Sequence, residues 1–184
     1  MNTVYSPGIR KLQTSNTTRR RVLGFYQIVG GAIGLVMASL VLSHLFSTEY
    51  VRDYRLITIV SFVILLYIFS IACGTLLLMN KESAYSYSLA QQAAQVLSLD
   101  VGSFGFTYVS GVNLSVGIDV DGTAIMSFHV GISNFWATIG GEAGLHKIMF
   151  NLVAIYLIYY IIELRKNIRK EMVLKNAEDL TGAQ

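Results

Sequence analysis

Residues 22–46 read VLGFYQIVGGAIGLVMASLVLSHLF, a run of 25 residues without a single Asp, Glu, Lys or Arg. About 20 apolar helical residues cross the hydrocarbon core of a bilayer, so this run is long enough to span it with some tilt. The polar residues 1–21 before it end in Arg19, Arg20 and Arg21. A secretory signal has a shorter apolar core and a small-residue cleavage site, so we expect an uncleaved membrane span.

Two more apolar runs follow. Residues 56–79 carry no formal charge, and the short linker 47–55 allows only a tight turn, so residues 22–79 are expected to form a transmembrane helical hairpin. Residues 148–164 form a shorter run that predicts a third span. Residues 165–184 keep helix-forming residues and predict a basic helical tail in water. The sequence therefore predicts an α-helical integral membrane protein with three transmembrane helices.

Composition supports a membrane protein and limits the other classes. Hydrophobic residues make up 53% of the chain and charged residues 14%, against about 25% charged in an ordinary soluble domain. The formal charge of +3 is too small to indicate nucleic-acid binding. The single cysteine, Cys73, excludes an internal disulfide and a cysteine-based zinc site, and its apolar surroundings predict a small core residue.

Residues 80–147 have a different texture and predict an extramembrane or interfacial module. Residues 84–99 are expected to form a half-apolar helix. After Asp100 the apolar period changes to two, which is typical of half-buried strands. Two strands, 113–120 and 124–132, are predicted, with possible flanking strands at 104–109 and 134–139. The module is therefore expected to be a small α+β unit rich in antiparallel hairpins.

The register of the central hairpin follows from its two faces. A two-residue loop would oppose apolar to polar side chains, whereas a three-residue loop, 121–123, opposes Val116 to Phe128 and Ile118 to Met126. We therefore predict the three-residue loop, with Phe128 in a small core and His129 on the solvated opposite face.

The positive charges do not settle the orientation. The tail before the first span has five Arg and Lys, the linker two, the module two and the final tail five. With three crossings the two sides carry seven each, although both tails favour the cytoplasm. Three interpretations stay open: three crossings with a cytoplasmic N-terminus, which is the simplest; an additional crossing or re-entrant segment within 80–146, with 123–145 as the main candidate; and dual topology.

Small residues at a spacing of four predict close helix packing. Gly30, Gly34 and Ala38 have this spacing in the first span, and Ser70 and Gly74 repeat it in the second. Packing between the protein's own two helices explains this spacing more economically than dimerisation with a second copy. Basic residues at the span ends are expected to lie at the membrane surface, namely Arg19, Arg20, Arg21, Arg165, Lys166, Arg169 and Lys170.

No catalytic, cofactor or metal site is predicted. His44, His129 and His146 lack metal-type spacing, and no nucleophile elbow, phosphate loop or H-E-x-x-H motif is present. The spans contain no Asp, Lys or Arg, which disfavours an ion pathway within one chain. We expect a small non-catalytic accessory or scaffold component of a membrane complex, with the lipid bilayer and a membrane protein or a second copy as partners. The alternative is an oligomeric channel or transporter subunit, with a path lined by Gln27, Ser61, Thr75 or Asn151.

Overall fold

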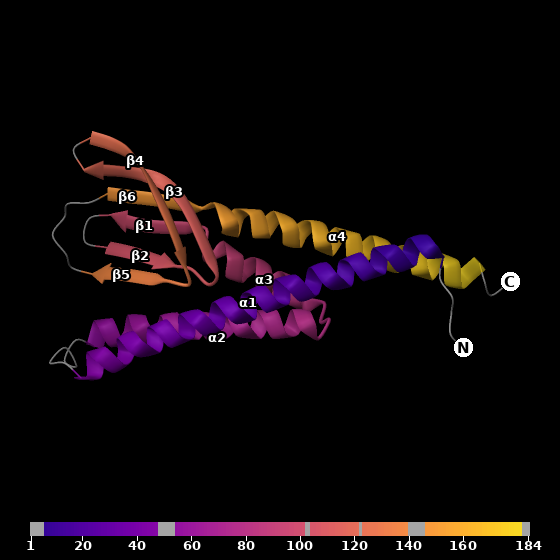
Figure 1. Cartoon of the computed structure of the whole chain (residues 1–184), viewed down its shortest axis with the longest axis horizontal. Coiled ribbons are helices and arrows are strands. Elements are labelled where there is room, and N and C mark those ends of the chain that lie inside the picture. Colours follow the sequence, from indigo (N-terminus) through magenta and orange to yellow (C-terminus); the bar gives the residue numbers. More distant parts are fainter. Residues whose placement is uncertain (1–5, 48–53, 102–103, 122, 140–145, 182–184) are drawn as a thin grey trace.

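The computed structural model describes residues 6–47, 54–101, 104–121, 123–139 and 146–181. These residues form four helices and six strands, with both chain ends at one end of an elongated molecule (Figure 1). The helices are α1 (Pro7–Ser47), α2 (Tyr54–Leu78), α3 (Ser83–Ala93) and α4 (Leu152–Thr181). The strands are β1 (Leu97–Val101), β2 (Phe104–Tyr108), β3 (Val112–Asp121), β4 (Thr123–Ile132), β5 (Phe135–Ile139) and β6 (His146–Asn151).

Helices α1 and α2 form the predicted antiparallel hairpin, and they are the two described helices long and apolar enough to cross a membrane. Glycines allow their close approach. A Cβ on Gly34 would lie 1.9 Å from the Tyr67 ring, and one on Gly74 would lie 2.5 Å from the Gly24 carbonyl oxygen. Tyr67 fills the space at Gly34, is fully buried, and donates a hydrogen bond to the Val109 carbonyl oxygen at 3.2 Å.

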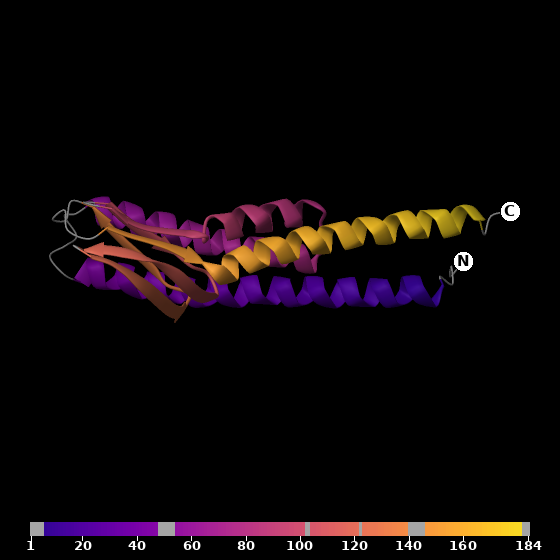
Figure 2. The same cartoon turned by 90° about the horizontal axis from the view of Figure 1, so that it is seen from above.

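The six strands form one curled antiparallel sheet in the order β4-β3-β6-β1-β2-β5, a half-barrel beside the two long helices (Figures 1 and 2). Its β2 and β5 side packs against α1 and α2. There Phe106 and Phe135 contact the cluster of Ala38, Val63 and Tyr67. Gly111, with φ +105°, lets the turn between β2 and β3 approach α1 at Gly30. The half-barrel therefore lies alongside the apolar parts of α1 and α2.

The predicted register of the central hairpin is confirmed, but its predicted core is wrong. Val116 pairs with Phe128 and Ile118 with Met126, as the three-residue loop requires. Phe128, however, is 67% exposed. The apolar side chains share one face as predicted, but this face points out of the half-barrel, whereas the polar face that includes His129 lines its inside.

Both predicted flanking strands are confirmed as β2 and β5, and two more strands escaped the prediction. The expected helix over 84–99 ends at Ala93, and Leu97–Val101 forms β1. Leu97 and Leu99 alternate with Ser98 and Asp100 in this strand, but the alternation is short and directly follows the helical segment. The stretch 123–145 supplies β4 and β5, so its described residues contain no additional helical crossing.

The third helical span is not shown, because residues 148–151 belong to strand β6. This strand pairs with both β1 and β3, so it is central and apolar on its outer face. The chain changes from strand to helix at Asn151. Its side-chain Oδ1 accepts hydrogen bonds from the backbone N–H groups of Val153 and Ala154 at 3.0 and 3.3 Å, which is an N-cap for α4. Sequence alone had placed this amide inside a span.

The first turns of α1 and the second half of α4 form a stalk beyond the half-barrel (Figure 2). Asn16 donates a hydrogen bond of 2.9 Å to Glu171, and the backbone N–H of Ser6 donates one of 3.2 Å to Glu178. The predicted basic tail is thus paired with the N-terminal tail. Three crossings would separate the two tails, whereas the structure has them side by side at one end (Figure 1).

Candidate functional site

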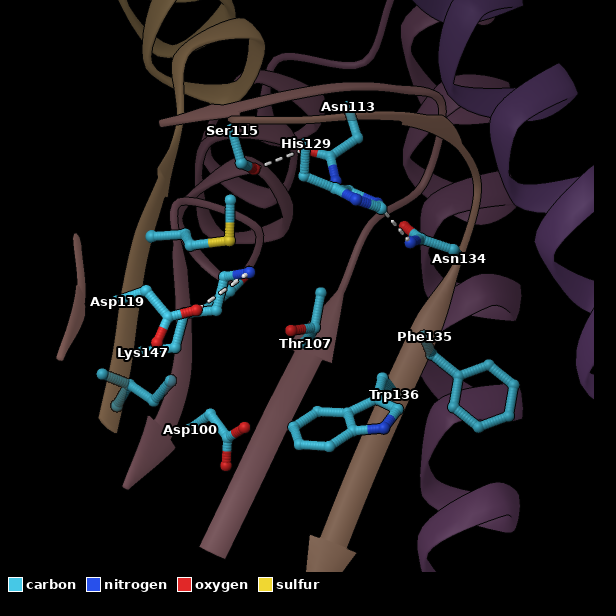
Figure 3. A pocket seen from close by; sticks show the side chains of 13 residues that line it. Asp100, Thr107, Asn113, Ser115, Asp119, His129, Asn134, Phe135, Trp136 and Lys147 are labelled. Carbon is cyan, nitrogen blue, oxygen red and sulfur yellow. Dashed lines mark hydrogen bonds and ion pairs between the residues drawn. The ribbon is translucent and has the colours of Figure 1, made fainter. Parts of the chain in front are cut away.

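The inner face of the half-barrel encloses a polar hollow of about 510 Å³, which we call the cup (Figure 3). In strands β3, β4 and β6, every second side chain points toward the cup, and most of these side chains are polar. Asn113 and Ser115 from β3 are 1% exposed. The full lining consists of Ser98, Leu99, Asp100, Thr107, Asn113, Ser115, Asp119, His129, Asn134, Phe135, Trp136, Lys147 and Met149.

Three charged residues form a row across adjacent strands of the cup. Register pairs Asp119 on β3 with Lys147 on β6, and Lys147 with Asp100 on β1. The Lys147 Nζ lies 3.9 Å from Asp119 Oδ2, an ion pair with both side chains about one-third exposed. No described cation stands within ion-pair distance of Asp100. One amine between two carboxylates leaves the row with a net negative charge.

The indole of Trp136 lies flat over strand β2 beside Asp100. Gly105 makes this possible, because a Cβ there would lie 2.2 Å from the indole ring and 3.0 Å from Asp100 Oδ1. Figure 3 shows the ring and this carboxylate at the same end of the cup. At the other end, His129 Nε2 contacts the Asn134 amide nitrogen at 3.3 Å, which connects β4 to the residue before β5. The predicted solvated histidine is exposed, as expected, but belongs to the cup wall.

Several polar atoms on the inner face are buried without a hydrogen-bond partner in the described part of the chain. They are Asp119 Oδ1, Asn134 Oδ1 and Ser127 Oγ. Buried polar atoms in native structures nearly always have a partner, either protein or water. Asp119 Oδ1 and Asn134 Oδ1 can only accept and Ser127 Oγ can accept or donate, so the inner face has unused hydrogen-bonding capacity among the described residues.

The outer face of the half-barrel is apolar and exposed over β4, β3 and β6. A contiguous exposed apolar surface is typical of a surface that contacts lipid or another protein. Polar inside with apolar outside is also the alternation of membrane β-barrels. The most exposed members of the outer face are Val112, Ile118, Met126, Phe128, Val130, Ile132, Ile148 and Phe150.

A second polar cluster, the glutamine network, is buried where α1, α2 and α3 meet the half-barrel. Ser70 is its centre: its hydroxyl lies 2.9 Å from that of Ser110 and accepts a bond of 3.1 Å from Gln91 Nε2. Gln95 Oε1 accepts the backbone N–H of Ser110 at 2.7 Å, and Ser88 donates to Gln27 Oε1 at 3.1 Å. Gln91 and Gln95 are 1% exposed, and no local pattern predicts this, because glutamine is mostly a surface residue.

The predicted packing residues lie at two different contacts. Gly34, Ala38, Ser70 and Gly74 are buried between α1 and α2. Gly30 instead contacts the turn at Gly111, where a Cβ would lie 2.6 Å from the backbone nitrogen. Two further close glycines, Gly24 and Gly31, were missed, although both face α2 at short distance. Their signal was present, since Gly24, Gly31 and Gly34 follow a helical period.

The basic residues before the first span mark the start of the stalk. Arg19 lies 3.9 Å from Glu163 on α4, and Arg20 donates a hydrogen bond to Asn80 after α2. Arg21 is exposed. These positions hold α1 against both neighbouring helices.

The basic residues on α4 are mostly on its open surface. Lys166, Arg169 and Lys170 are exposed, whereas Arg165 is half-buried with an unpartnered Nε. A hollow of about 370 Å³ lies between the stalk helices and the start of α3, next to Tyr85. The pKa of the Tyr85 hydroxyl is raised above its ordinary value, mainly because the side chain is buried. Nearby Arg20 opposes this rise and Glu171 adds to it.

Comparison with protein families, with curated proteins and with solved structures finds no match. The described residues contain no group of three or more His, Cys, Asp or Glu that could hold a metal ion. Chemically, the cup offers carboxylates, an amine, amides and one indole. This set suits reversible binding through hydrogen bonds and charge.

Proposed function

We propose that this protein is a non-catalytic integral membrane protein that acts by binding, as an accessory or scaffold component of a membrane complex. The observation that supports this most is the half-barrel itself, which has an apolar exposed outside and a polar hollow inside, next to two apolar helices. A lipid bilayer is the solvent that suits this outer face. The module predicted as extramembrane or interfacial is therefore proposed to lie within the bilayer, beside α1 and α2.

The distribution of charge supports an orientation for this multi-pass arrangement. Positive residues favour the cytoplasmic side. Among the described Lys and Arg, only Arg55 and Lys147 lie toward the loop end of the molecule. Leu23 of α1 and Leu77 of α2 belong to one buried cluster, which lies toward the end of the molecule that holds both termini. The remaining described Lys and Arg lie near this cluster or between it and the termini: Arg10, Lys11, Arg19, Arg20, Arg21, Lys81, Arg165, Lys166, Arg169, Lys170 and Lys175.

We infer from this that both termini are cytoplasmic. In the proposed orientation the chain returns through β6 and α4 to the side from which it started, so the equal charge count that favours dual topology no longer applies. The even number of crossings that both tails favour is achieved without a fourth apolar helix. Strands β1 to β6 and the first part of α4 take its place.

The open edges of the sheet support a partner. Strands β4 and β5 are the two ends of the strand order, so each has one edge without a neighbouring strand. Unpaired backbone N–H and C=O groups are unfavourable in the hydrocarbon region unless protein or water satisfies them. An adjoining strand or helix of a membrane partner would satisfy them, which is the role of a scaffold component.

The alternative function is a channel or transporter subunit, which the polar inner face favours as one wall of a path completed by oligomerisation. The path suggested by sequence is not assembled, because Gln27 and Asn151 are 0–1% exposed and Ser61 is on the open surface of α2. Reconstituted vesicles distinguish the two functions. A scaffold gives no ion flux above that of empty vesicles, whereas a channel subunit gives flux that changes when Asp119 is replaced by Asn.

A matched pair of substitutions tests the proposed position in the membrane. Val130 on β4 and Val173 on the stalk are 73% and 67% exposed. A Lys on the lipid face of a membrane barrel costs about 2–4 kcal/mol at mid-depth and about 0–1 kcal/mol near the interfaces. We expect Val130→Lys to lower the inserted, folded yield strongly and Val173→Lys to leave it unchanged. Equal tolerance of both would place the outer face in water and overturn the proposal.

The partner is tested with photo-crosslinking residues in the full chain in its native membrane. A probe at Phe128, on edge strand β4, should give one adduct of defined mass, while a probe at Val36 on the open surface of α1 should give only lipid adducts. The same adduct at both positions, or none at either, would contradict a partner at the β4 edge.

A further inference from the structure

We propose that the cup binds a protonated primary amine, with Asp100, Asp119 and Trp136 as its main contacts. This rests on the proposed binding function of the cup and goes beyond it by naming the ligand class. Primary ammonium groups are present in aminophospholipid headgroups and in small soluble amines. Both sources offer the same chemistry, which is one positive charge and three N–H donors.

The charge of the cup selects for a cation. Lys147 is already within 3.9 Å of Asp119, and Asp100 on its other side has no described cation within ion-pair distance. The row therefore has an excess carboxylate among half-buried side chains, and a charge interaction there is stronger than at a fully exposed surface. An anion would meet this carboxylate without compensation.

An unpartnered atom selects for a hydrogen-bond donor. Asp119 Oδ1, on the same charged row as Asp100, is a buried acceptor without a partner in the described residues. An ammonium group carries donors only, so it matches an acceptor that no side chain satisfies. A quaternary ammonium, which has the same charge but no N–H, would leave this atom unsatisfied.

The indole adds a third feature. Trp136 is held beside Asp100 by the space at Gly105, and it is partly exposed to the cup. An aromatic face within about 6 Å of a cation attracts it, and Trp is the strongest of the aromatic residues in this interaction. A carboxylate and an indole face side by side therefore define the end of the cup where the ammonium group would sit.

A neighbouring apolar hollow offers a place for a lipid chain. An apolar hollow of about 430 Å³ lies on the opposite side of edge strand β5, between Phe62 of α2 and Phe104 of β2. A lipid with its headgroup in the cup could place a chain along this edge. A soluble amine would need the cup alone.

The experiment uses the full chain in nanodiscs and the fluorescence of Trp136, which is the single tryptophan in the sequence. In nanodiscs of phosphatidylcholine only, propylammonium and propionate are added as a pair of similar size and opposite charge. We expect saturable fluorescence change with propylammonium, at least tenfold weaker binding in Asp100→Asn, and no change in affinity in Asp179→Asn, which alters an exposed stalk carboxylate.

The second arm distinguishes the sources. If replacing phosphatidylcholine by phosphatidylethanolamine changes the emission and blocks propylammonium, the ligand is a lipid headgroup. If the lipid has no effect and propylammonium still binds, the ligand is a soluble amine. Equal or tighter binding of propionate, or no saturable binding of either ion, overturns the amine site. This comparison uses the unaltered chain, so it is valid even if Asp100→Asn fails to fold. The Val130→Lys test of the membrane position does not depend on ligand binding. A failure of the amine site would therefore leave the proposed membrane position unaffected.

Discussion

The glutamine network and the cup are both polar, and both lie beside the apolar helices, but they differ in how their atoms are satisfied. In the network, Ser70, Gln91 and Gln95 are 0–1% exposed and joined by bonds of 2.7 to 3.3 Å. In the cup, Asp119 and Asn134 each keep a buried acceptor without a partner. Gln27 Nε2 is the network's corresponding exception.

This difference separates a structural polar cluster from a binding one. A buried network whose members satisfy one another fixes the relative positions of the elements that supply them. Here it connects α1, α2 and α3 to the turn between β2 and β3. A hollow with unsatisfied acceptors contributes little to the fold and keeps its hydrogen-bonding capacity for another molecule. Substitutions in the two clusters should therefore affect stability very differently.

The largest expected effect is that of Ser70→Ala. The change removes the hydroxyl that contacts Ser110 and accepts from Gln91, so two buried groups lose a partner. At about 1–3 kcal/mol for each unsatisfied group, we expect a loss of about 2–6 kcal/mol in the free energy of unfolding. Denaturant unfolding in micelles, followed by circular dichroism, measures it.

Ser61→Ala is the control, because Ser61 is on the same helix but exposed. It should change the free energy of unfolding by less than about 0.5 kcal/mol. If the two serines gave equal losses, the network would not be the structural element that its geometry indicates.

A somewhat smaller effect is expected for Gly34→Ala, at the contact that positions Tyr67 beneath the half-barrel. The added Cβ would lie 1.9 Å from a ring that is fully buried and hydrogen-bonded to Val109. Overpacking of this kind costs about 1–3 kcal/mol. The thermal unfolding midpoint should fall, whereas Gly8→Ala, with nothing within 4 Å of the new Cβ, should not lower it. A neutral Gly34→Ala would show that α1 and α2 can separate without loss.

The sequence predicted the two long apolar helices and the central hairpin register, because both follow from local patterns. Residues 22–46 are apolar without interruption, and the alternation around Phe128 permits one register. It could not predict which face of the hairpin would be inside. The pattern is identical for a soluble sheet and for a sheet with lipid outside, and only the neighbouring strands decide it.

The missed strands have the same kind of cause. Leu97–Val101 alternates, but it directly follows a helical segment, and His146–Asn151 runs into the apolar start of α4. Pairing of β6 between β1 and β3 is a long-range contact that no local period reveals. The charged row of the cup follows from that pairing, since Lys147 has Asp119 and Asp100 as its register partners only when β6 is central.

The smallest expected effect on stability is that of Asp119→Asn, and it is the sharpest test of the comparison. The ion pair with Lys147 spans 3.9 Å between partly exposed side chains. Pairs of this kind contribute about 0–1 kcal/mol. The other oxygen, Oδ1, has no partner in the described residues, so its replacement breaks no further bond. We therefore expect a change below about 1 kcal/mol in the same unfolding measurement.

Glu171→Gln in the stalk is the matched control for Asp119→Asn, because its carboxylate is buried and bonded to both Asn16 and Lys175 at 2.9 and 2.7 Å. Hydrogen bonds to charged groups contribute about 1.5–3 kcal/mol each, so this control should be the more destabilising of the two changes. The opposite order, with Asp119→Asn as costly as Ser70→Ala, would mean that the charged row holds the half-barrel together. The cup would then be part of the structural framework, and its open acceptors would not indicate a ligand.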